Sequence, residues 1–415
     1  MFTRVHPVIA AAIVVSCLQA TTLSASASDP VLDWNQIAVA TTAVQGAVPQ
    51  VRSMAIVQTA VHDAVNAITG RYETYSPMGA APAGASVDAA VIAAAHHTLS
   101  RLFPSQAGPL ATLRAASLAA HSLTEADPGI AVGEAAGAAI LALRANDGAA
   151  QANFPYVAPG AGLPGVWVAI GTAPPVTPGW GRVVPWVLWS GSQFLPDAPP
   201  ALDSGRYARD VEEVKALGAL NNHSRTMDQT RIADFWRGSP AAIWNGVATG
   251  VVTARGLDQS STARTFALLY LASADASIVC WNAKYTYNFW RPQAAIVNAD
   301  LDGNDATVAD PSWLPLFPTP PHPEYPSGHT SNSGAMAKVL SLLFGDDPGV
   351  PITATSPTTP TFPRAWGTFT EGVDEVIDAR IYSGFHFRTA DDVGAKLGRQ
   401  VARFVVNHTL RRADR

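Results

Sequence analysis

Apolar residues recur at three- and four-residue spacing along much of the chain, the pattern of helices packed on one face. Residues 34 to 68 read as helix, most clearly from 51 onward, and further helices are predicted at about 86–103, 109–122 and 130–145. The helical pattern resumes near residues 203 and 243. We find no convincing strand hairpin and no internal repeat. The pattern therefore predicts an all-α fold.

Residues 153–202 interrupt this pattern with many prolines, glycines and tryptophans. Neither a helix nor a central strand tolerates that composition, so a long ordered loop is expected, and loops of this length are often functional. We divide the chain into an N-terminal helical region at 28–260, which includes this excursion, and a C-terminal helical bundle at 261–415.

The C-terminal part opens with an apolar helix that is expected to start near Arg264 and to end or kink at Pro292. Lys284 and Arg291 are seven residues apart, two helical turns, which places both cations on one side of such a helix. Aromatic residues surround them. Burying two cations is unfavourable unless something anionic meets them.

Two further stretches carry polar residues at helix ends. Ser327, Gly328 and His329 follow a proline and precede the apolar run 335–344, which predicts a helix N-terminus suited to an anion. Arg380 lies in the last turn of another predicted helix, and His386 follows it. A break near Gly384 would let these two side chains converge.

The composition of the chain argues against some classes of function. The chain has 415 residues, 48% hydrophobic and 14% charged, with a net charge of −5, so a nucleic-acid partner is not expected. The most apolar stretch beyond the N-terminus, 266–279, is too short for a membrane span and contains Asp275. Cys280 is expected to be a buried filler.

Residues 1–27 have a basic start, an apolar run and a small-residue cleavage site, which predicts a signal peptide removed after Ala27. A lipoprotein signal is the alternative, which would leave Cys17 acylated at the new N-terminus. The protein is therefore expected to be secreted or periplasmic.

Three motifs occur in order: K-x6-R-P at 284–292, P-S-G-H at 326–329 and A-R-x5-H at 379–386. This triple pattern resembles the superfamily that joins vanadium-dependent haloperoxidases with type 2 phosphatidic acid phosphatases and bacterial acid phosphatases. The motifs span about a quarter of the chain. The resemblance, with the long helical N-terminal half, implies the haloperoxidase architecture of two helical bundles with long loops, the C-terminal bundle carrying the site.

The chemistry of the motifs agrees with an oxyanion site for vanadate or phosphate. Lys284, Arg291 and Arg380 would supply positive charge, and the arginines would offer planar pairs of donors. The Ser327 hydroxyl and the Gly328 N–H would add donors at a helix start, where glycine lets the backbone come close to the anion.

By resemblance, His386 binds the central atom, as the vanadium ligand of a haloperoxidase or as the nucleophile of a phosphatase. His329 then acts as acid or base on the apical oxygen, and Lys284 polarises the peroxide. Trp281 and His322 match halide-pocket positions: the former resembles chloroperoxidases, the latter bromoperoxidases. This mixture favours bromide or iodide over chloride.

One position departs from the phosphatase pattern. The phosphatases carry an aspartate four residues after the nucleophilic histidine, where this chain has Ala390, and Asp391 comes one residue later. That shift moves the carboxylate by about 100° around a helix, so Asp391 is expected to miss His386. What would orient His386 is left open.

The sequence therefore predicts a secreted vanadium-dependent haloperoxidase that binds vanadate as cofactor and uses hydrogen peroxide, a halide and a small organic acceptor. A soluble acid phosphatase working through a phosphohistidine is the alternative, and an oxyanion-binding protein without turnover is a third hypothesis. The oligomeric state stays open.

Overall fold

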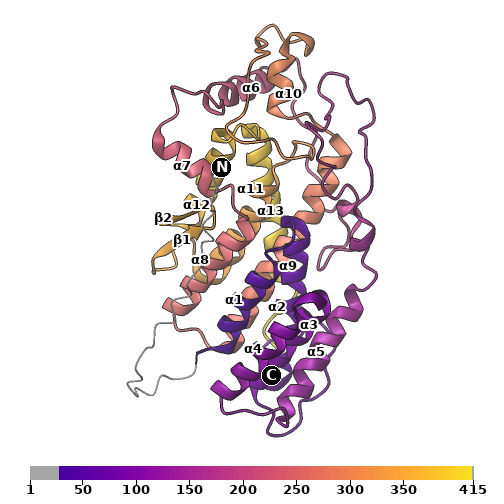
Figure 1. The fold of residues 1–415 in the computed structure, drawn as a ribbon, viewed down its shortest axis with the longest axis vertical. Coiled ribbons are helices and arrows are strands. Elements are labelled where there is room, and N and C mark those ends of the chain that lie inside the picture. The colour runs from indigo at the N-terminus through magenta and orange to yellow at the C-terminus, as the bar shows by residue number, and fades with distance from the viewer. Residues whose placement is uncertain (1–27, 414–415) are drawn as a thin grey trace, which may run out of the picture.

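The computed structural model describes residues 28–413. The predicted signal peptide and its Cys17 alternative lie outside these residues. The all-α prediction is confirmed (Figure 1): thirteen α-helices and one small hairpin occur in the described part. They are α1 Pro30–Thr42, α2 Ala47–Thr69, α3 Val87–Leu102, α4 Ala107–Ala120, α5 Pro128–Arg144, α6 Gly205–Leu217, α7 Met227–Phe235, α8 Pro240–Ala254, α9 Gln259–Tyr287, α10 Pro292–Val297, α11 Gly328–Phe344, β1 Ile352–Ser356, β2 Thr359–Trp366, α12 Phe369–Tyr382 and α13 Arg388–His408.

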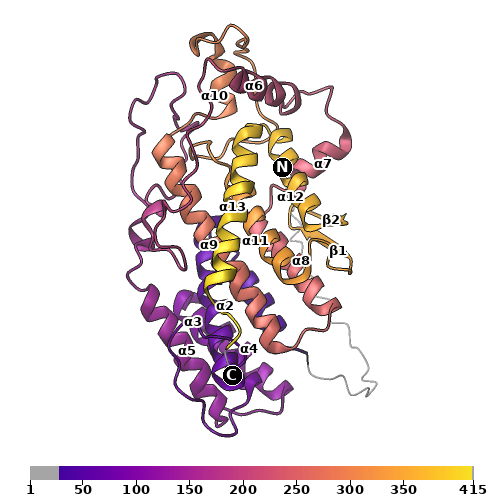
Figure 2. The same cartoon turned by 180° about the vertical axis from the view of Figure 1, so that it is seen from behind.

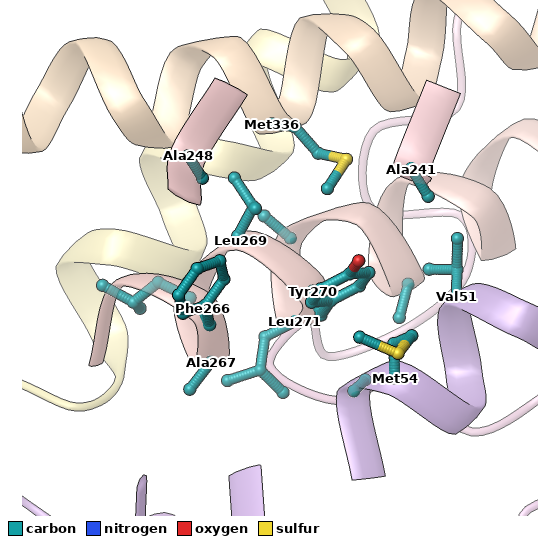
Figure 3. Packing of buried hydrophobic residues seen from close by; sticks show 14 of the residues in the cluster. Val51, Met54, Ala241, Ala248, Phe266, Ala267, Leu269, Tyr270, Leu271 and Met336 are labelled. Carbon is teal, nitrogen blue, oxygen red and sulfur yellow. The ribbon is translucent and has the colours of Figure 1, made fainter. Parts of the chain in front are cut away.

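Helix α9 is the axis of the fold. It packs against α2, α11 and α13, and its apolar side chains are buried on every side. Figure 3 shows Phe266, Leu269 and Leu271 of α9 surrounded by side chains of α2, α8 and α11. The helix is long and apolar enough to cross a membrane, but 94% of its most apolar window is buried inside this protein. It is therefore accounted for as a core helix.

The other helices gather around the two ends of α9 (Figures 1 and 2). Helices α3, α4 and α5 form one end, while α11 and α13 pack along the other part and α12 packs against α11. One continuous apolar cluster contains residues from both groups, from Val31 to Leu410. The proposed division near residue 260 stays a prediction.

The excursion at 153–202 is a loop with one short 3-10 turn at Trp180–Arg182, and it is fastened to α9. The buried carboxylate of Asp275, in the middle of α9, accepts hydrogen bonds from the backbone N–H groups of Trp186, Val187 and Leu188 at 2.7 to 3.0 Å. Three donors offset much of the cost of burying this carboxylate. The excursion is thereby held against the core.

Three sequence predictions about local structure were wrong. Strands β1 and β2 form an antiparallel hairpin where none was expected, because prolines break its alternating pattern. The predicted helix at 34–68 is two helices, separated at residues 43–46. Finally, α9 ends at Tyr287, where Asn288 adopts a left-handed conformation with φ 47°. Arg291 therefore does not share a helix with Lys284; it precedes α10.

Helices α11 and α13 approach closely through glycines of α13, which matters because α11 begins inside the functional region described below. A Cβ atom at Gly398 would lie 2.1 Å from the Ser331 carbonyl oxygen and 2.6 Å from the Ala335 nitrogen. Both obstacles are backbone atoms, so relief requires the two helices to move apart.

We predict that Gly398→Ala lowers the free energy of unfolding by about 1–3 kcal/mol, because the added methyl group overpacks this contact. Gly246→Ala is the matched control: Gly246 is an exposed position within α8, and apart from the adjacent residues and backbone of its own helix, no atom of residues 28–413 lies within 4 Å of a new Cβ there. That substitution should stabilise by up to about 1 kcal/mol. Chemical denaturation of both variants tests this, and equal effects would contradict the close packing of α11 and α13.

Candidate functional site

Three cationic side chains meet in the interior. Lys284 in the last turn of α9, Arg291 before α10 and Arg380 in the last turn of α12 are 0%, 1% and 2% exposed. Within residues 28–413, no acidic side chain forms an ion pair with any of them. Buried charges normally pair with opposite charges, so this cluster is arranged to meet an anion.

Backbone carbonyl groups hold the cations in place. The Lys284 ammonium donates to the carbonyls of Pro323 and Glu324 at 2.9 and 2.8 Å, which leaves its third N–H available to a ligand. Arg291 donates from Nε to the His322 carbonyl and from Nη1 to that of Phe385, at 2.9 and 2.8 Å. Carbonyl dipoles fix these side chains without cancelling their charge.

Burial is also the main cause of their altered acidity. It lowers the pKa of Lys284 to about 8, that of Arg291 to about 10 and that of Arg380 to about 9. All three groups remain positively charged at neutral pH, where the Lys284 ammonium is the one nearest to losing its proton. A bound anion would favour the charged form of each.

A cavity of about 250 Å³ lies beside the cationic cluster, and Arg380, His329 and His386 line it directly. The first residues of three helices line it: α2 at 46–48, α8 at 239–241, and α11 at Gly328 and His329. A helix N-terminus carries a partial positive charge and unpaired N–H groups. The ends of three helices therefore add to the positive potential of the side chains, and the cavity as a whole favours an anion.

His386 is positioned by a carboxylate that the sequence motifs did not indicate. Its Nδ1 lies 2.8 Å from Oε1 of Glu324, which also accepts the backbone N–H of Phe387 at 3.0 Å. On the other side of the ring, Arg291 Nη1 lies 3.2 Å from Nε2. Since a guanidinium can only donate, Nε2 accepts, and we assign the proton to Nδ1.

This assignment leaves the Nε2 lone pair facing the cationic cluster. Burial, followed by the charge of Arg291, lowers the pKa of His386 well below its ordinary value, so the ring is neutral. Burial raises the pKa of the facing Glu324 to about 8, opposed by the charges of Lys284 and Arg291. An unprotonated Nε2 is the form that a metal ligand or a nucleophile requires.

His329 lies in the first turn of α11 and lines the same cavity. Its ring hydrogen-bonds to the carbonyl of Gly238, and burial lowers its pKa well below the ordinary value. The carbonyl of Trp236 accepts from Arg380 Nη1 at 3.0 Å. The connection between α7 and α8 thus positions one histidine and one arginine of the site, a role that no motif in this segment signalled.

Several buried polar atoms around the cavity make no hydrogen bond within residues 28–413, among them Ser327 Oγ, His329 Nε2 and Arg380 Nε. Together with the third N–H of Lys284, these atoms could meet the oxygens of a tetrahedral oxyanion, as phosphate and vanadate are bound. In the described part of the chain, no group of three or more His, Cys, Asp or Glu side chains could hold a metal cation. The donor set fits an oxyanion ligated by one histidine.

Asp391 is fully buried and faces Ser327 and Arg380. The structure places no hydrogen bond between Asp391 and His386, as the shift of one position had indicated. Burial raises the pKa of Asp391 well above its ordinary value, against the opposing charge of Arg380.

The two predicted halide-pocket residues are adjacent. The rings of Trp281 and His322 lie 5.4 Å apart, and both line the cavity. Trp281 donates through Nε1 to the carbonyl of Val176 at 3.2 Å, which places the excursion in the cavity wall. Arg291 Nη2 donates to His322 Nδ1 at 2.9 Å. A Cβ at Gly328 would lie 3.1 Å from the Trp281 ring, so the glycine makes room for it.

Six of the predicted site residues therefore line one cavity: Trp281, His322, Gly328, His329, Arg380 and His386. Arg291 contacts two of them, His322 and His386, from behind this lining, and Lys284 and Ser327 are buried beside it. Glu324, the Trp236–Gly238 carbonyls and Val176 were not among the residues predicted. A glutamate within the proline-rich stretch 320–326 was a visible signal for the first, because a charged residue in such a segment needs a partner. Trp236, Gly238 and Val176 contribute backbone carbonyl groups, and because every residue has one, the sequence gives no signal of these roles.

Comparisons with known proteins agree with this geometry. The family profile described as the second helical-bundle domain of VCPO matches residues 264–415. Vanadium chloroperoxidase of Curvularia inaequalis is 26% identical over 201 residues, which cover 40% of this chain but only 32% of that protein. The match thus spans about a third of the curated relative's length.

Solved structures extend the likeness to nearly the whole chain. The structure described as the first bacterial vanadium-dependent iodoperoxidase has a TM-score of 0.78 and 26% identity, covering 93% of this chain and 97% of that one. An apo-type bacterial vanadium-dependent chloroperoxidase has a TM-score of 0.70 and 18% identity, covering 88% and 95%, a likeness that concerns the fold.

We predict that the site binds a tetrahedral anion more weakly as pH rises through about 8. Lys284 then loses its positive charge while Glu324 gains a negative one, so both titrations act in the same direction. Sulfate is the suitable probe, because its own charge is constant between about pH 6 and pH 9.5. Isothermal titration should show affinity falling about tenfold per pH unit above 8.

The variant Lys284→Gln distinguishes the effect of Lys284 titration from that of Glu324 titration. At about pH 6 the variant should bind sulfate at least roughly tenfold more weakly than the wild type, because one close positive charge is gone. Above pH 8 the two proteins should converge. A constant ratio across the pH range would contradict the assignment of Lys284 as the titrating cation.

Glu324→Ala should release His386 from its fixed tautomer, because the acceptor of the Nδ1 proton is lost. Nitrogen NMR of the histidine rings should show a mixture of tautomers, and orthovanadate affinity should fall about 10- to 100-fold, as for other groups that orient a ligand. Glu324→Gln retains Oε1 as an acceptor and should keep the tautomer. A wild-type His386 spectrum in the alanine variant would refute this role.

Proposed function

This chain belongs to the superfamily that unites vanadium-dependent haloperoxidases with type 2 phosphatidic acid phosphatases, and we propose that it is a vanadate-dependent haloperoxidase. The reaction would consume hydrogen peroxide, a halide ion and a proton, and release hypohalous acid and water. The observation that carries this proposal is the neutral His386, whose Nε2 faces Arg291 in a cluster of three buried cations that form no ion pair with an acidic side chain of the described residues.

The residues present fit vanadate. His386 Nε2 would be its ligand, and Lys284, Arg291, Arg380, Ser327 and the Gly328 N–H would hold its oxygens. When bound, vanadate supplies a Lewis-acidic centre that activates hydrogen peroxide towards attack by a halide.

The surrounding side chains would move protons and stabilise charge. The third N–H of Lys284 is available to the peroxide and would polarise it as the oxygen–oxygen bond breaks. His329 Nε2 makes no hydrogen bond to the described part of the chain and is held in a neutral ring. It would accept a proton from incoming peroxide and return it to the departing oxygen, as acid–base catalysis requires.

For the halide we propose a site beside Trp281 and His322, with bromide or iodide preferred over chloride. Arg291 Nη2 lies 2.9 Å from Nδ1 and 3.3 Å from Nε2 of His322, so a buried positive charge stands beside the ring where it lines the cavity. The aromatic surface of Trp281 suits a large polarisable anion. The similarity to an iodoperoxidase structure over 93% of the chain supports this preference.

A phosphatase remains the second candidate function, and one observation favours it. A nucleophilic histidine needs a hydrogen-bond acceptor on its far nitrogen, and Glu324 Oε1 supplies one from another segment. The missing aspartate at position 390 therefore no longer counts against phosphate transfer to His386. The same pocket could bind a phosphate monoester in place of vanadate.

We also propose that the protein is exported, from the signal-like pattern of residues 1–27. N-terminal sequencing of the protein recovered from the medium or periplasm would identify the cleavage site, expected after Ala27 or, in the lipoprotein alternative, before Cys17.

We predict that the purified protein brominates a dimedone-type acceptor with hydrogen peroxide only after orthovanadate is added. Loss of the acceptor's absorbance measures this, and nitrophenyl phosphate is assayed in parallel on the vanadate-free protein. Phosphate release that vanadate inhibits, without bromination, would replace the haloperoxidase proposal with the phosphatase one.

Substitutions of the two histidines should have different effects on vanadate binding and on the turnover rate. His386→Ala should abolish vanadate binding, because the proposed ligand from the protein is removed. His329→Ala should retain binding and slow turnover about 10²- to 10⁴-fold, the usual contribution of acid–base catalysis. Equilibrium dialysis and steady-state rates provide the two measurements. Full activity in both variants would refute the site.

A further inference from the structure

The cavity beside the cations has two chemically different halves. The polar half is lined by His322, Gly328, His329, Asn332, Arg380 and His386. The other half is apolar and comes mainly from outside the three C-terminal motifs: Val48 and Val51 of α2, Val176 of the excursion, and Pro240 and Ala241 of α8. Val48, Val51 and Ala241 are 3%, 2% and 2% exposed. Figure 3 shows Val51 and Ala241 on the same side of the apolar core.

Oxyanion chemistry does not require this apolar half. A tetrahedral anion needs donors and positive charge, which the polar half supplies alone. The whole cavity measures about 250 Å³. An apolar cavity of about 150 Å³ holds a benzene-sized molecule, so there is room for one such ring beside the small anion. A ring system much larger than one ring would compete with the anion for space.

The cavity also has an entrance and a polar group suited to such a ligand. Gly46 and Ala47 are exposed at its rim. Ser239 begins α8 but does not cap it; its hydroxyl donates to Gln50 Oε1 at 3.1 Å instead. The hydroxyl oxygen keeps its lone pairs, so it can accept a hydrogen bond from a ligand O–H.

We propose that the apolar half is a binding site for the organic acceptor, and that this acceptor is a single-ring phenol. Its ring would pack on Val51 and Ala241, and its hydroxyl would donate to Ser239. This inference rests on the proposed haloperoxidase function for its chemistry, although binding of the phenol does not depend on it.

The halogenation step then occurs inside the protein. A ring carbon of the phenol attacks the halogen of hypohalous acid, so that a carbon–halogen bond forms and the oxygen–halogen bond breaks. The released hydroxide takes the proton lost from that carbon, which gives halophenol and water. Because the wall fixes the ring, the enzyme should favour one ring position more than free hypohalous acid does.

Phenol binding is tested first without vanadate, peroxide or halide. In ligand-observed NMR titrations phenol should bind the wild-type protein, and 2-naphthol should compete with sulfate where phenol does not. Ala241→Leu fills the apolar half and should weaken phenol binding about tenfold. Its neighbour Ala242→Leu is the matched control, since Ala242 does not line the cavity, and should bind phenol normally.

Titration of the Ala241→Leu variant with sulfate tests whether the variant is folded and whether the polar half of the cavity is intact. The affinity of the variant for sulfate should equal that of the wild type. Ser239→Ala should reduce the preference for phenol over anisole, which has no O–H. Phenol binding that is absent, or equal in both leucine variants, would overturn the acceptor site. If phenol binds as predicted but no bromination follows with vanadate, the proposed function fails instead.

If bromination occurs, the ratio of ortho to para bromophenol gives a second test. It should differ from the ratio that free hypobromous acid produces and should move towards that ratio in Ala241→Leu. An identical ratio in the wild-type protein and in free solution would mean that bromination takes place outside the cavity, which would overturn the proposal.

Discussion

The site depends on the burial of three positive charges that form no ion pair with an acidic side chain within residues 28–413. Transferring Lys284, Arg291 and Arg380 from water into the interior is strongly unfavourable, and carbonyl groups offset only part of this cost. The charge that the carbonyl groups do not compensate produces a positive electrostatic potential in the cavity, and three helix N-termini add to it. The protein therefore holds its ligand-binding energy in a prearranged form, and little reorganisation is needed when an anion enters.

Such a potential requires a rigid surrounding structure, which the helices provide. Helix α9 is buried on all sides and ends at the cavity, so Lys284 projects from an element that cannot shift easily. Helix α13 approaches α11 through Gly398, which fixes the start of α11 and with it Ser327 and His329. The apolar core thus serves the polar site: it fixes the positions of charges that would otherwise move apart or attract water.

The parts of the site that the sequence predicted are those carried by side chains at fixed spacing. Lys284 and Arg291 converge as expected, but for another reason: Asn288 ends the helix, and the chain turns so that both cations reach the carbonyls of residues 322–324. The carbonyl of Gly238 could not be predicted, because any residue there has one and only the tertiary fold directs it at His329. Prolines likewise hid the β1–β2 hairpin by disrupting its alternation.

His386 shows why a missing motif residue is weak evidence against a chemical role. A histidine that binds through Nε2 needs a hydrogen-bond acceptor at Nδ1, and physics does not specify which segment supplies it. An aspartate four residues later could do so from the same helix; here Glu324 does so from the segment that precedes Ser327. This solution links two motifs directly, because the same residue offers its carbonyl to Lys284 and its carboxylate to His386. A change in one group is therefore felt by the other, and the proton state of Glu324 couples the charge of the cluster to the basicity of the histidine that faces it.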